Sequence, residues 1–424
     1  MKSRIRLVLA AALVGIGALA PALALTIQPG TYRLEWRIPE ANTPPAGYQG
    51  ASLQIMSDHE AKPFVGLRST KCYSGTTGSL TILLDESKGT GKGYDTAYIV
   101  PKPAGDSTID LGQATAIPLK RNGEALESDP TNKAEVYLLI GEKGAQVPQK
   151  AAASVSVEFH STQERKEPWV YATVELRGGW HGTVKTDGGD LEVQTIDNNS
   201  NGLYDDTLSV RASDNWPTLG DSIRLGTMSE GGDWTSVWLG EASSYDGKLY
   251  VIKVSKIGDT VDIQPYKGDV GKIMFQALDG SNKPAKCERV MVFGKYGMFD
   301  LPHQNDLTVP VGQYRCLYAT VTLANQAQQR GRSAAVTGIA VRPKGSVRVS
   351  KGGEAILRVG GPVKLAIEPE SKVITLARGQ EKHVALAFTA GRDDLGGVMG
   401  SRSAQVAIKN SKGKVLMRGE AGFG

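Results

Sequence analysis

The chain has 424 residues, 40% of them hydrophobic, so one core is not expected to serve it and two to four domains are. Three cysteines are too few for a small protein held together by disulfides. The formal net charge of +5 conceals a division, because residues 325–424 hold 17 Lys+Arg against 7 Asp+Glu, whereas residues 187–279 hold 16 acids against 7 bases.

The N-terminus has the pattern of an export signal. Cations at positions 2, 4 and 6 precede an apolar run over 7–20, and small residues at 22–24 offer a cleavage site. We expect residues 1–24 to be a signal peptide, removed before Leu25, and the mature protein to be periplasmic or extracellular. No later stretch is apolar enough for a transmembrane span, no lipidated cysteine follows the cleavage site, and nucleic acid is not expected as a partner.

Short alternating apolar segments dominate the rest of the chain, for example 31–38, 154–159 and 248–254. They are rich in β-branched and aromatic residues and are interrupted by Gly, Asn and Asp every 8–12 positions or so. The pattern predicts an all-β protein of tandem β-sandwich domains. We expect a β domain over 25–155, a second over 156–278, a third domain or bridging unit over 279–344, and a sandwich over 345–424.

Two pairs of segments suggest internal duplication. PGTYR at 29–33 is similar to VGQYR at 311–315, and each places a turn glycine before an alternating strand. The segments 80–100 and 191–210 both read strand, Asp, polar loop, Tyr-Asp, Thr, strand. The first copy is longer and carries Lys88 and Lys92 where oxygen ligands would be needed. We therefore predict one hairpin design used twice, of which only the second copy suits a cation.

The second loop, IDNNSNGLYDD at 196–206, fits a calcium site. Calcium takes six to eight oxygen ligands, and the pattern D-x-[DN]-x-[DN]-G supplies them from alternate residues before a turn glycine. The predicted ligands are the side chains at the first, third, fifth and ninth positions, the carbonyl at the seventh, and a compensating acid just after them: Asp197, Asn199, Asn201, Asp205, Leu203 and Asp206.

The loop departs from an EF-hand at its twelfth position, where Leu208 stands in place of glutamate. Closure into a hairpin over 208–210 is expected instead of a helix, as in calcium loops of extracellular repeat modules. Two neutral Asn ligands predict a dissociation constant of about 10⁻⁴–10⁻³ M. At about 0.1 mM affinity and about 2 mM calcium, binding would add about 1.8 kcal/mol to stability. The alternative is that the Asn-Gly pair simply makes a tight turn.

No familiar catalytic motif occurs: the chain has no H-E-x-x-H, G-x-S-x-G, C-x-x-C or Walker loop. Its five histidines, at 59, 160, 181, 303 and 383, lack ligand spacing. Converging carboxylates of a glycosidase site remain open, but a solvated acidic surface around the calcium loop is the simpler interpretation.

Aromatic, basic and cysteine residues each leave two interpretations. The aromatics at 180, 216, 234, 238 and 245 are either core residues or, above all Trp234 and Trp238, faces on which sugars stack. Six cations between positions 330 and 351 are either solvated or bind an anionic envelope polymer. Cys287 and Cys316 are close enough for a disulfide between neighbouring strands, or they and Cys72 are buried thiols.

Three segments carry a resemblance: the loop at 196–206, VPVGQYRCLYATVTL at 309–323, and VAIKNSKGKVLMRGEAGFG at 406–424. Together they resemble a group of uncharacterised exported bacterial β-sandwich proteins, and the alternation over 345–424 is similar to an immunoglobulin-like domain. The resemblance implies an architecture and no activity. We expect a non-catalytic, calcium-stabilised structural or adhesion protein of the envelope, with an unknown glycan, polymer or protein partner. The alternative is a carbohydrate-binding protein or glycan hydrolase using the Trp-rich acidic region.

Overall fold

All named elements of the structure are β-strands, as the sequence predicts. The structure is a computed structural model, and no helix in its described part is long and apolar enough to span a membrane. The described residues are 25–38, 48–60, 64–68, 71–77, 80–101, 109–111, 114–122, 125–128, 134–160, 169–209, 217–218, 220–227, 234–278, 283–285, 287–302, 306–322, 338–342, 345–361, 363–368, 385–390, 393–399, 404–409 and 415–421. The expected signal peptide lies outside these residues.

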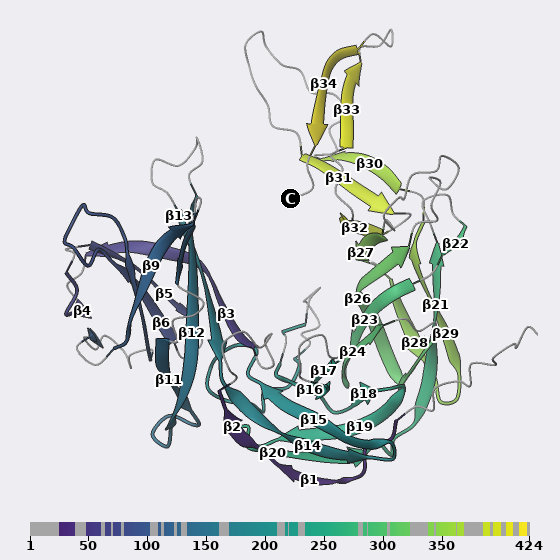
Figure 1. Cartoon of the computed structure of the whole chain (residues 1–424). Helices are drawn as coiled ribbons and strands as arrows, with labels where there is room; N and C mark the ends of the chain where they lie inside the picture. The colour runs from purple at the N-terminus through teal and green to yellow at the C-terminus, as the bar shows by residue number, and fades with distance from the viewer. Residues whose placement is uncertain are drawn as a thin grey trace, which may run out of the picture.

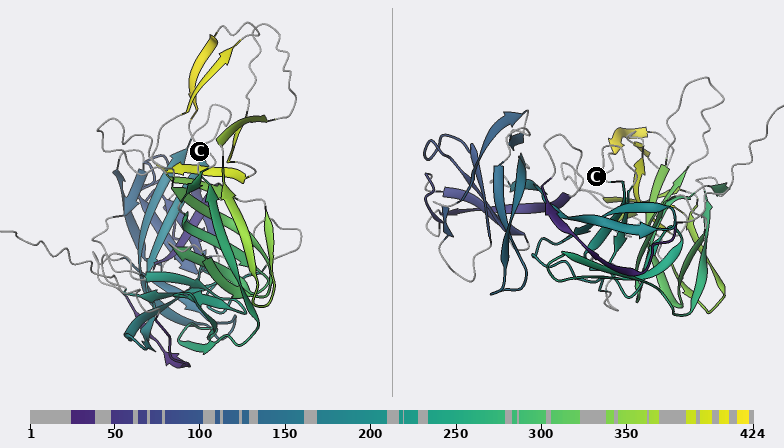
Figure 2. Two further views of the ribbon diagram at one scale, coloured as in Figure 1. Left: turned by 90° about the vertical axis from the view of Figure 1, so that its right-hand side faces the viewer. Right: turned by 60° about the horizontal axis from the view of Figure 1, so that its bottom comes forward.

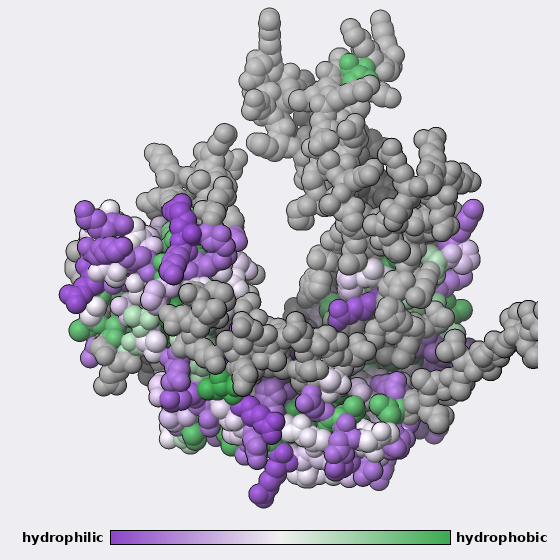
Figure 3. All heavy atoms as spheres, viewed as in Figure 1, coloured by the Kyte–Doolittle hydropathy of each residue, from purple (hydrophilic) through white to green (hydrophobic). Residues whose placement is uncertain are grey.

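The strands form three successive units in a U-shaped arrangement (Figure 1). The first unit is one limb, the middle unit is the base, and the third unit with the C-terminal strands is the other limb; Figure 2 shows the same division from two further directions. In the view of Figure 3 the described surface is mostly hydrophilic, with small scattered hydrophobic areas.

The first unit contains a nine-stranded sheet that closes on itself. Its order is β10-β9-β7-β6-β5-β3-β13-β12-β11, and β10 also pairs with β12. Alternation places one face inside: in β11, Ala134, Val136, Leu138 and Ile140 are buried. The strands of the sheet are β3 (Tyr48–Glu60), β5 (Lys71–Thr77), β6 (Leu80–Asp85), β7 (Thr96–Pro101), β9 (Ala116–Asn122), β10 (Ala125–Ser128), β11 (Ala134–Ile140), β12 (Val147–His160) and β13 (Trp169–Arg177). Two short strands of this unit, β4 (Phe64–Val65) and β8 (Ile109–Asp110), pair with each other outside it.

The middle unit is formed by a five-stranded sheet, β17-β16-β15-β14-β2, and a four-stranded sheet, β1-β20-β19-β18. Buried residues of both sheets, such as Val193 and Ile223 of one and Val261 and Ile263 of the other, belong to one hydrophobic core. The strands are β1 (Gly30–Arg33), β2 (Glu35–Arg37), β14 (Gly179–Thr186), β15 (Gly189–Ile196), β16 (Ser222–Gly226), β17 (Trp234–Trp238), β18 (Ser243–Tyr245), β19 (Lys248–Val254) and β20 (Thr260–Pro265).

The third unit has a core of its own, built from a four-stranded sheet (β22, β21, β25, β29) and an eight-stranded sheet (β24, β23, β26, β27, β32, β31, β30, β28), with β33 and β34 paired separately. Its strands are β21 (Val270–Leu278), β22 (Pro284–Ala285), β23 (Cys287–Gly294), β24 (Gly297–Pro302), β25 (Asp306–Pro310), β26 (Gly312–Thr322), β27 (Gly338–Arg342), β28 (Ser346–Val349), β29 (Glu354–Gly360), β30 (Val363–Glu368), β31 (Ala385–Ala390), β32 (Asp393–Met399), β33 (Ala404–Lys409) and β34 (Val415–Ala421).

Strand pairing divides the chain differently from the expected domain boundaries. The segment expected as one strand over 31–38 breaks at the buried Leu34, so that β1 pairs with β20 and β2 pairs with β14 in the middle unit. Residue 155 falls within β12, so the boundary expected there lies inside a strand. At the other end, β28 pairs with β26 and β29 pairs with β21 across the expected boundary at 345.

The short repeat has a structural counterpart. Tyr32 and Tyr314, the tyrosines of the two similar segments, each follow a glycine by two residues, and each donates its hydroxyl to the carbonyl four residues earlier, at 2.6 Å and 2.8 Å. Tyr314 is 1% exposed. The two segments therefore share a local corner, in which a tyrosine fixes the entry of a strand.

The three cysteines are buried thiols, and the expected disulfide does not form. Cys287 lies opposite Val321 whereas Cys316 lies opposite Val292, so the two thiols lie at well-separated points of the β23–β26 ladder. Neighbouring strands alone do not make a disulfide, because the two Cα atoms must also come within about 7 Å.

Candidate metal centre

The acidic loop after β15 is the candidate site. It begins at Asp197, directly after the last residue of the strand, and runs to Asp206. Of the predicted hairpin partner over 208–210, residue 210 lies outside the described residues. Leu208 and Ser209 do not form a strand: Ser209 makes an isolated bridge to Thr218, and β15 pairs with β14 and β16. The expected duplication of a whole hairpin therefore does not hold, since the first copy does pair β6 with β7.

Asp197 organises the loop around its carboxylate. Its Oδ2 accepts the backbone N–H of Gly202 at 2.7 Å and its Oδ1 accepts that of Asn201 at 3.2 Å. The turn requires left-handed backbone at Ser200 (φ 55°) and Gly202 (φ 86°). At Gly202 a Cβ would lie 2.4 Å from the Leu139 carbonyl oxygen, so glycine is needed for close approach as well.

Alternate side chains turn toward the same point. The Asn199 and Asn201 amides both donate to Asp206 Oδ2, at 2.8 Å and 2.7 Å. Their oxygens accept the N–H groups of Asn201 and Leu203, at 3.0 Å and 2.7 Å. Each amide oxygen has a second lone pair for a cation. The structure thus brings four of the predicted ligands, Asp197, Asn199, Asn201 and Asp206, into one hydrogen-bonded group.

Asp221 is the residue that the sequence pattern missed. It is fully buried, and its two oxygens accept the N–H groups of Asn198 at 3.0 Å and Asp206 at 2.9 Å. Its own N–H donates to the Asp206 carbonyl at 2.7 Å. It lies just before β16, and the pairing of Ile196 with Ser222 brings it to the loop. No spacing motif within the loop could have identified it.

The carboxylates of this group are electrostatically unsatisfied. Burial, reinforced by the charge of Asp206, raises the pKa of Asp197 to about 6 despite three backbone hydrogen bonds. Burial and the charge of Asp197 raise the pKa of Asp221 to about 8. Negative charge at neutral pH is therefore costly here, which is the electrostatic environment that a divalent cation would relieve.

In the first loop, between β6 and β7, neighbouring groups of the chain itself balance the charge of the acids. Glu86 accepts the N–H groups of Gly91 at 2.6 Å and Gly93 at 2.8 Å, and Asp95 accepts the N–H and hydroxyl of Ser87. Burial alone would raise the pKa of Asp95, but hydrogen bonds from Ser87 and Thr96, with the charge of Lys88 3.7 Å away, bring it below its usual value. The two loops thus differ in whether the chain itself balances the acids.

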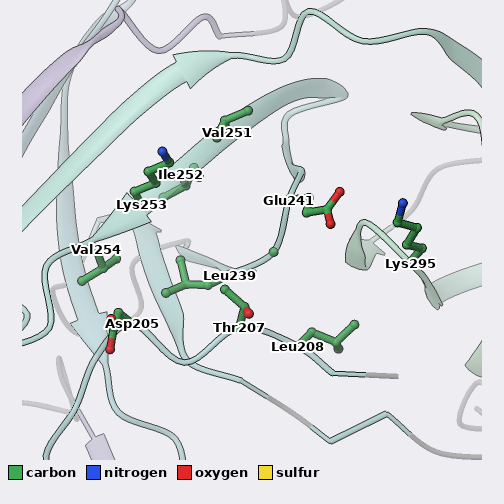
Figure 4. A pocket seen from close by; sticks show the side chains of 11 residues that line it. Asp205, Thr207, Leu208, Leu239, Glu241, Val251, Ile252, Lys253, Val254 and Lys295 are labelled. Atoms are coloured by element: carbon green, nitrogen blue, oxygen red, sulfur yellow. The ribbon is translucent and has the colours of Figure 1, made fainter. Parts of the chain in front are cut away.

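Asp205, the predicted ninth-position ligand, lines a neighbouring pocket of ≈ 560 Å³ (Figure 4). Leu208 borders the same pocket. The carbonyl of Leu203, the predicted seventh-position calcium ligand, stays a prediction. Among the described residues, no group of three or more His, Cys, Asp or Glu side chains is placed to hold a metal ion.

The other candidates separate into core and surface. Trp180 packs against the core and Tyr245 is 9% exposed, whereas Trp234 is 47% exposed. Trp216 and the histidines at 303 and 383 lie outside the described residues, as do the cations at 330, 332 and 344. Of the remaining basic residues, Lys351 pairs with Asp269 at 2.8 Å, which favours the solvated interpretation for that position.

No family model, curated protein or solved structure matches this chain. The resemblance to exported β-sandwich proteins therefore remains a prediction, and the functional argument depends on the geometry of the loop.

Proposed function

We propose that the protein is an exported structural or adhesion protein of the cell envelope, stabilised by one calcium ion in the loop after β15, and that it has no catalytic activity. The single observation that carries the proposal is the pair of buried, mutually repelling carboxylates of Asp197 and Asp221 beside a set of oxygen-bearing side chains. Calcium prefers such oxygen ligands and supplies the missing positive charge.

The ligands would be the side chains of Asp197, Asn199, Asn201 and Asp206, with the Leu203 carbonyl. Calcium would displace the amide N–H groups that now contact Asp206, and the second lone pair of each Asn oxygen would face the ion. Asp221 accepts backbone hydrogen bonds with both oxygens and would hold the loop in shape. The mixed neutral and charged set favours affinity of about 10⁻⁴–10⁻³ M, a range typical of extracellular modules.

The position of the loop supports a structural role for the ion. Gly202 accepts a hydrogen bond through its carbonyl from the N–H of Gly141, in the turn after β11 of the first unit, at 2.9 Å. Tyr204 donates its N–H to Lys256 in the middle unit at 3.0 Å, and Lys256 forms an ion pair with Glu142. An ion in this loop would stiffen the junction between two units.

The experiment is a thermal melt of the chain beginning at Leu25, in EDTA and in millimolar calcium, with magnesium as a control. We expect calcium to raise the melting temperature and magnesium to do so much less, because magnesium prefers a smaller octahedral site. Limited proteolysis at the junction should slow in calcium. An identical melt in all three conditions would refute the calcium proposal and leave the loop as a turn.

A further inference from the structure

A row of polar side chains crosses the outer face of the five-stranded sheet in the middle unit. Strand register places five residues directly opposite one another across β2, β14, β15, β16 and β17, namely Glu35, His181, Gln194, Arg224 and Ser236. Neighbouring side chains in such a row lie about 5 Å apart. The alternate residues of the same strands, such as Val193, Ile223 and Val237, face the core.

The centre of this row is buried but lacks hydrogen-bond partners. Gln194 is fully buried, and neither its Nε2 nor its Oε1 has a partner in the structure. His181 Nε2, opposite Gln194 on β14, and Trp238 Nε1, on β17 two strands from Gln194, are also unsatisfied. These four atoms are half of the eight such buried side-chain atoms in the described part of the chain. A buried polar atom without a hydrogen-bond partner is destabilising, so the presence of four such atoms on one sheet face indicates a site for a polar ligand.

Arg224 adds a positive charge to this face. Burial lowers the pKa of its guanidinium, and no carboxylate among the described residues pairs with it. The guanidinium carbon lies 4.4 Å from the ring centroid of Trp234, which fixes its plane by a cation–π contact. A half-buried, fixed guanidinium is the side chain best suited to bind a carboxylate through two parallel hydrogen bonds.

The Gln194 amide packs directly over Gly179. At this glycine, opposite Arg37, a Cβ would lie only 2.8 Å from Gln194 Nε2, so the amide can take this position only over a glycine. Trp234 is 47% exposed and lies on the same face as Trp238, four residues along β17. Burial, with the charges of Arg37 and Arg224, lowers the pKa of His181 to about 4, so the imidazole is neutral at pH 7 and offers one donor and one acceptor.

We propose that this face, from His181 through Gln194 and Arg224 to Trp234 and Trp238, binds an acidic sugar, a pyranose that carries a carboxylate. The carboxylate neutralises Arg224, and hydroxyl groups, which both donate and accept, satisfy the Gln194 amide, the imidazole and the indole N–H. A neutral sugar leaves the guanidinium without a counter-charge, and a simple inorganic anion leaves the Gln194 and Trp238 atoms unsatisfied. The exposed indole supplies an apolar face for the ring.

This site does not depend on the calcium loop, so the two proposals fail separately. The test is calorimetric titration of the chain beginning at Leu25 with D-glucuronate, D-glucose and inorganic phosphate, all in calcium buffer. We expect glucuronate to bind and glucose and phosphate to bind at least tenfold more weakly. Equal binding of glucose, equal binding of phosphate, or binding of none of the three would overturn the proposal.

Three variants assign the binding to this face. Arg224→Met should weaken glucuronate at least tenfold, whereas Arg348→Met, the same change at an exposed position on β28, should leave it unchanged. Gln194→Leu should weaken binding while keeping or raising the melting temperature, because it removes two unsatisfied polar atoms without changing shape. Unaltered binding in both site variants, or a strongly lowered melting temperature of Gln194→Leu, would show that the row has a structural role instead.

Discussion

Replacing Asp197 by Asn separates a calcium site from a simple turn. The amide keeps an acceptor for the N–H groups of Gly202 and Asn201 but removes a buried charge. Because the surroundings raise the pKa of Asp197 from 3.8 to about 6, its charged form costs up to about 3 kcal/mol at pH 7.5. Weaker hydrogen bonds to a neutral acceptor offset about 1 kcal/mol of this. In EDTA, Asp197→Asn should therefore be more stable than the wild type by about 1–2 kcal/mol.

Calcium should cancel that advantage. The wild type should gain about 1.8 kcal/mol at about 2 mM calcium, whereas the variant, without its central carboxylate, should gain almost nothing. The assay is urea unfolding of both proteins in EDTA and in calcium. Asp95→Asn in the first loop is the matched control, and it should lose the same stability in both buffers because its pKa is lowered, not raised. The reasoning is refuted if Asp197→Asn is destabilised in EDTA as much as in calcium.

Three further predictions concern stability. In EDTA the melting temperature should rise as the pH falls from about 8 toward 5. The folded-state pKa values, near 6 for Asp197 and 8 for Asp221, exceed the unfolded value, so stability is lost as the pH rises through them. The same pH dependence in saturating calcium would contradict this. Gly202→Ala should lower the free energy of unfolding by more than about 1–3 kcal/mol, because the residue has a positive φ and its Cβ would lie 2.4 Å from a carbonyl oxygen. Gly144→Ala, at a similar φ with open space around it, should lower the free energy of unfolding clearly less in the same denaturant titration. Equal losses in the two variants would exclude the clash. Tyr314→Phe should destabilise the third unit by about 1–3 kcal/mol through loss of a buried 2.8 Å hydrogen bond, and unchanged unfolding would rule out the tyrosine corner as a stabilising element.

Alternation of apolar residues predicted individual strands well. The segment 248–254 coincides with β19, and the predicted strand at 154–159 lies within β12. The segment 31–38 is not one strand, because the backbone passes at Leu34 from one sheet to the other although the alternation of apolar residues continues through it. Strand pairing depends on contacts between segments that are distant in the sequence. Such pairing places the N-terminal strands β1 and β2 in the middle unit.

The same limit applies to the candidate sites. The spacing of Asp197, Asn199 and Asn201 predicted their convergence, because all three belong to one loop. Asp221 reaches that loop only through the β15–β16 pairing, and Gln194 meets Arg224 only through the same ladder. Of the two interpretations of Cys287 and Cys316, the structure shows the buried thiols. The disulfide interpretation anticipated neighbouring strands but not the register between them.

Calcium stoichiometry is the most direct measure of the proposed ion site. Isothermal titration of the EDTA-treated chain beginning at Leu25 with calcium chloride, and of Asp197→Asn in parallel, counts bound ions without depending on stability. We expect one ion per wild-type chain, with a dissociation constant of about 10⁻⁴–10⁻³ M, and none at this site in the variant. No binding to the wild type, or equal binding to both proteins, would contradict it.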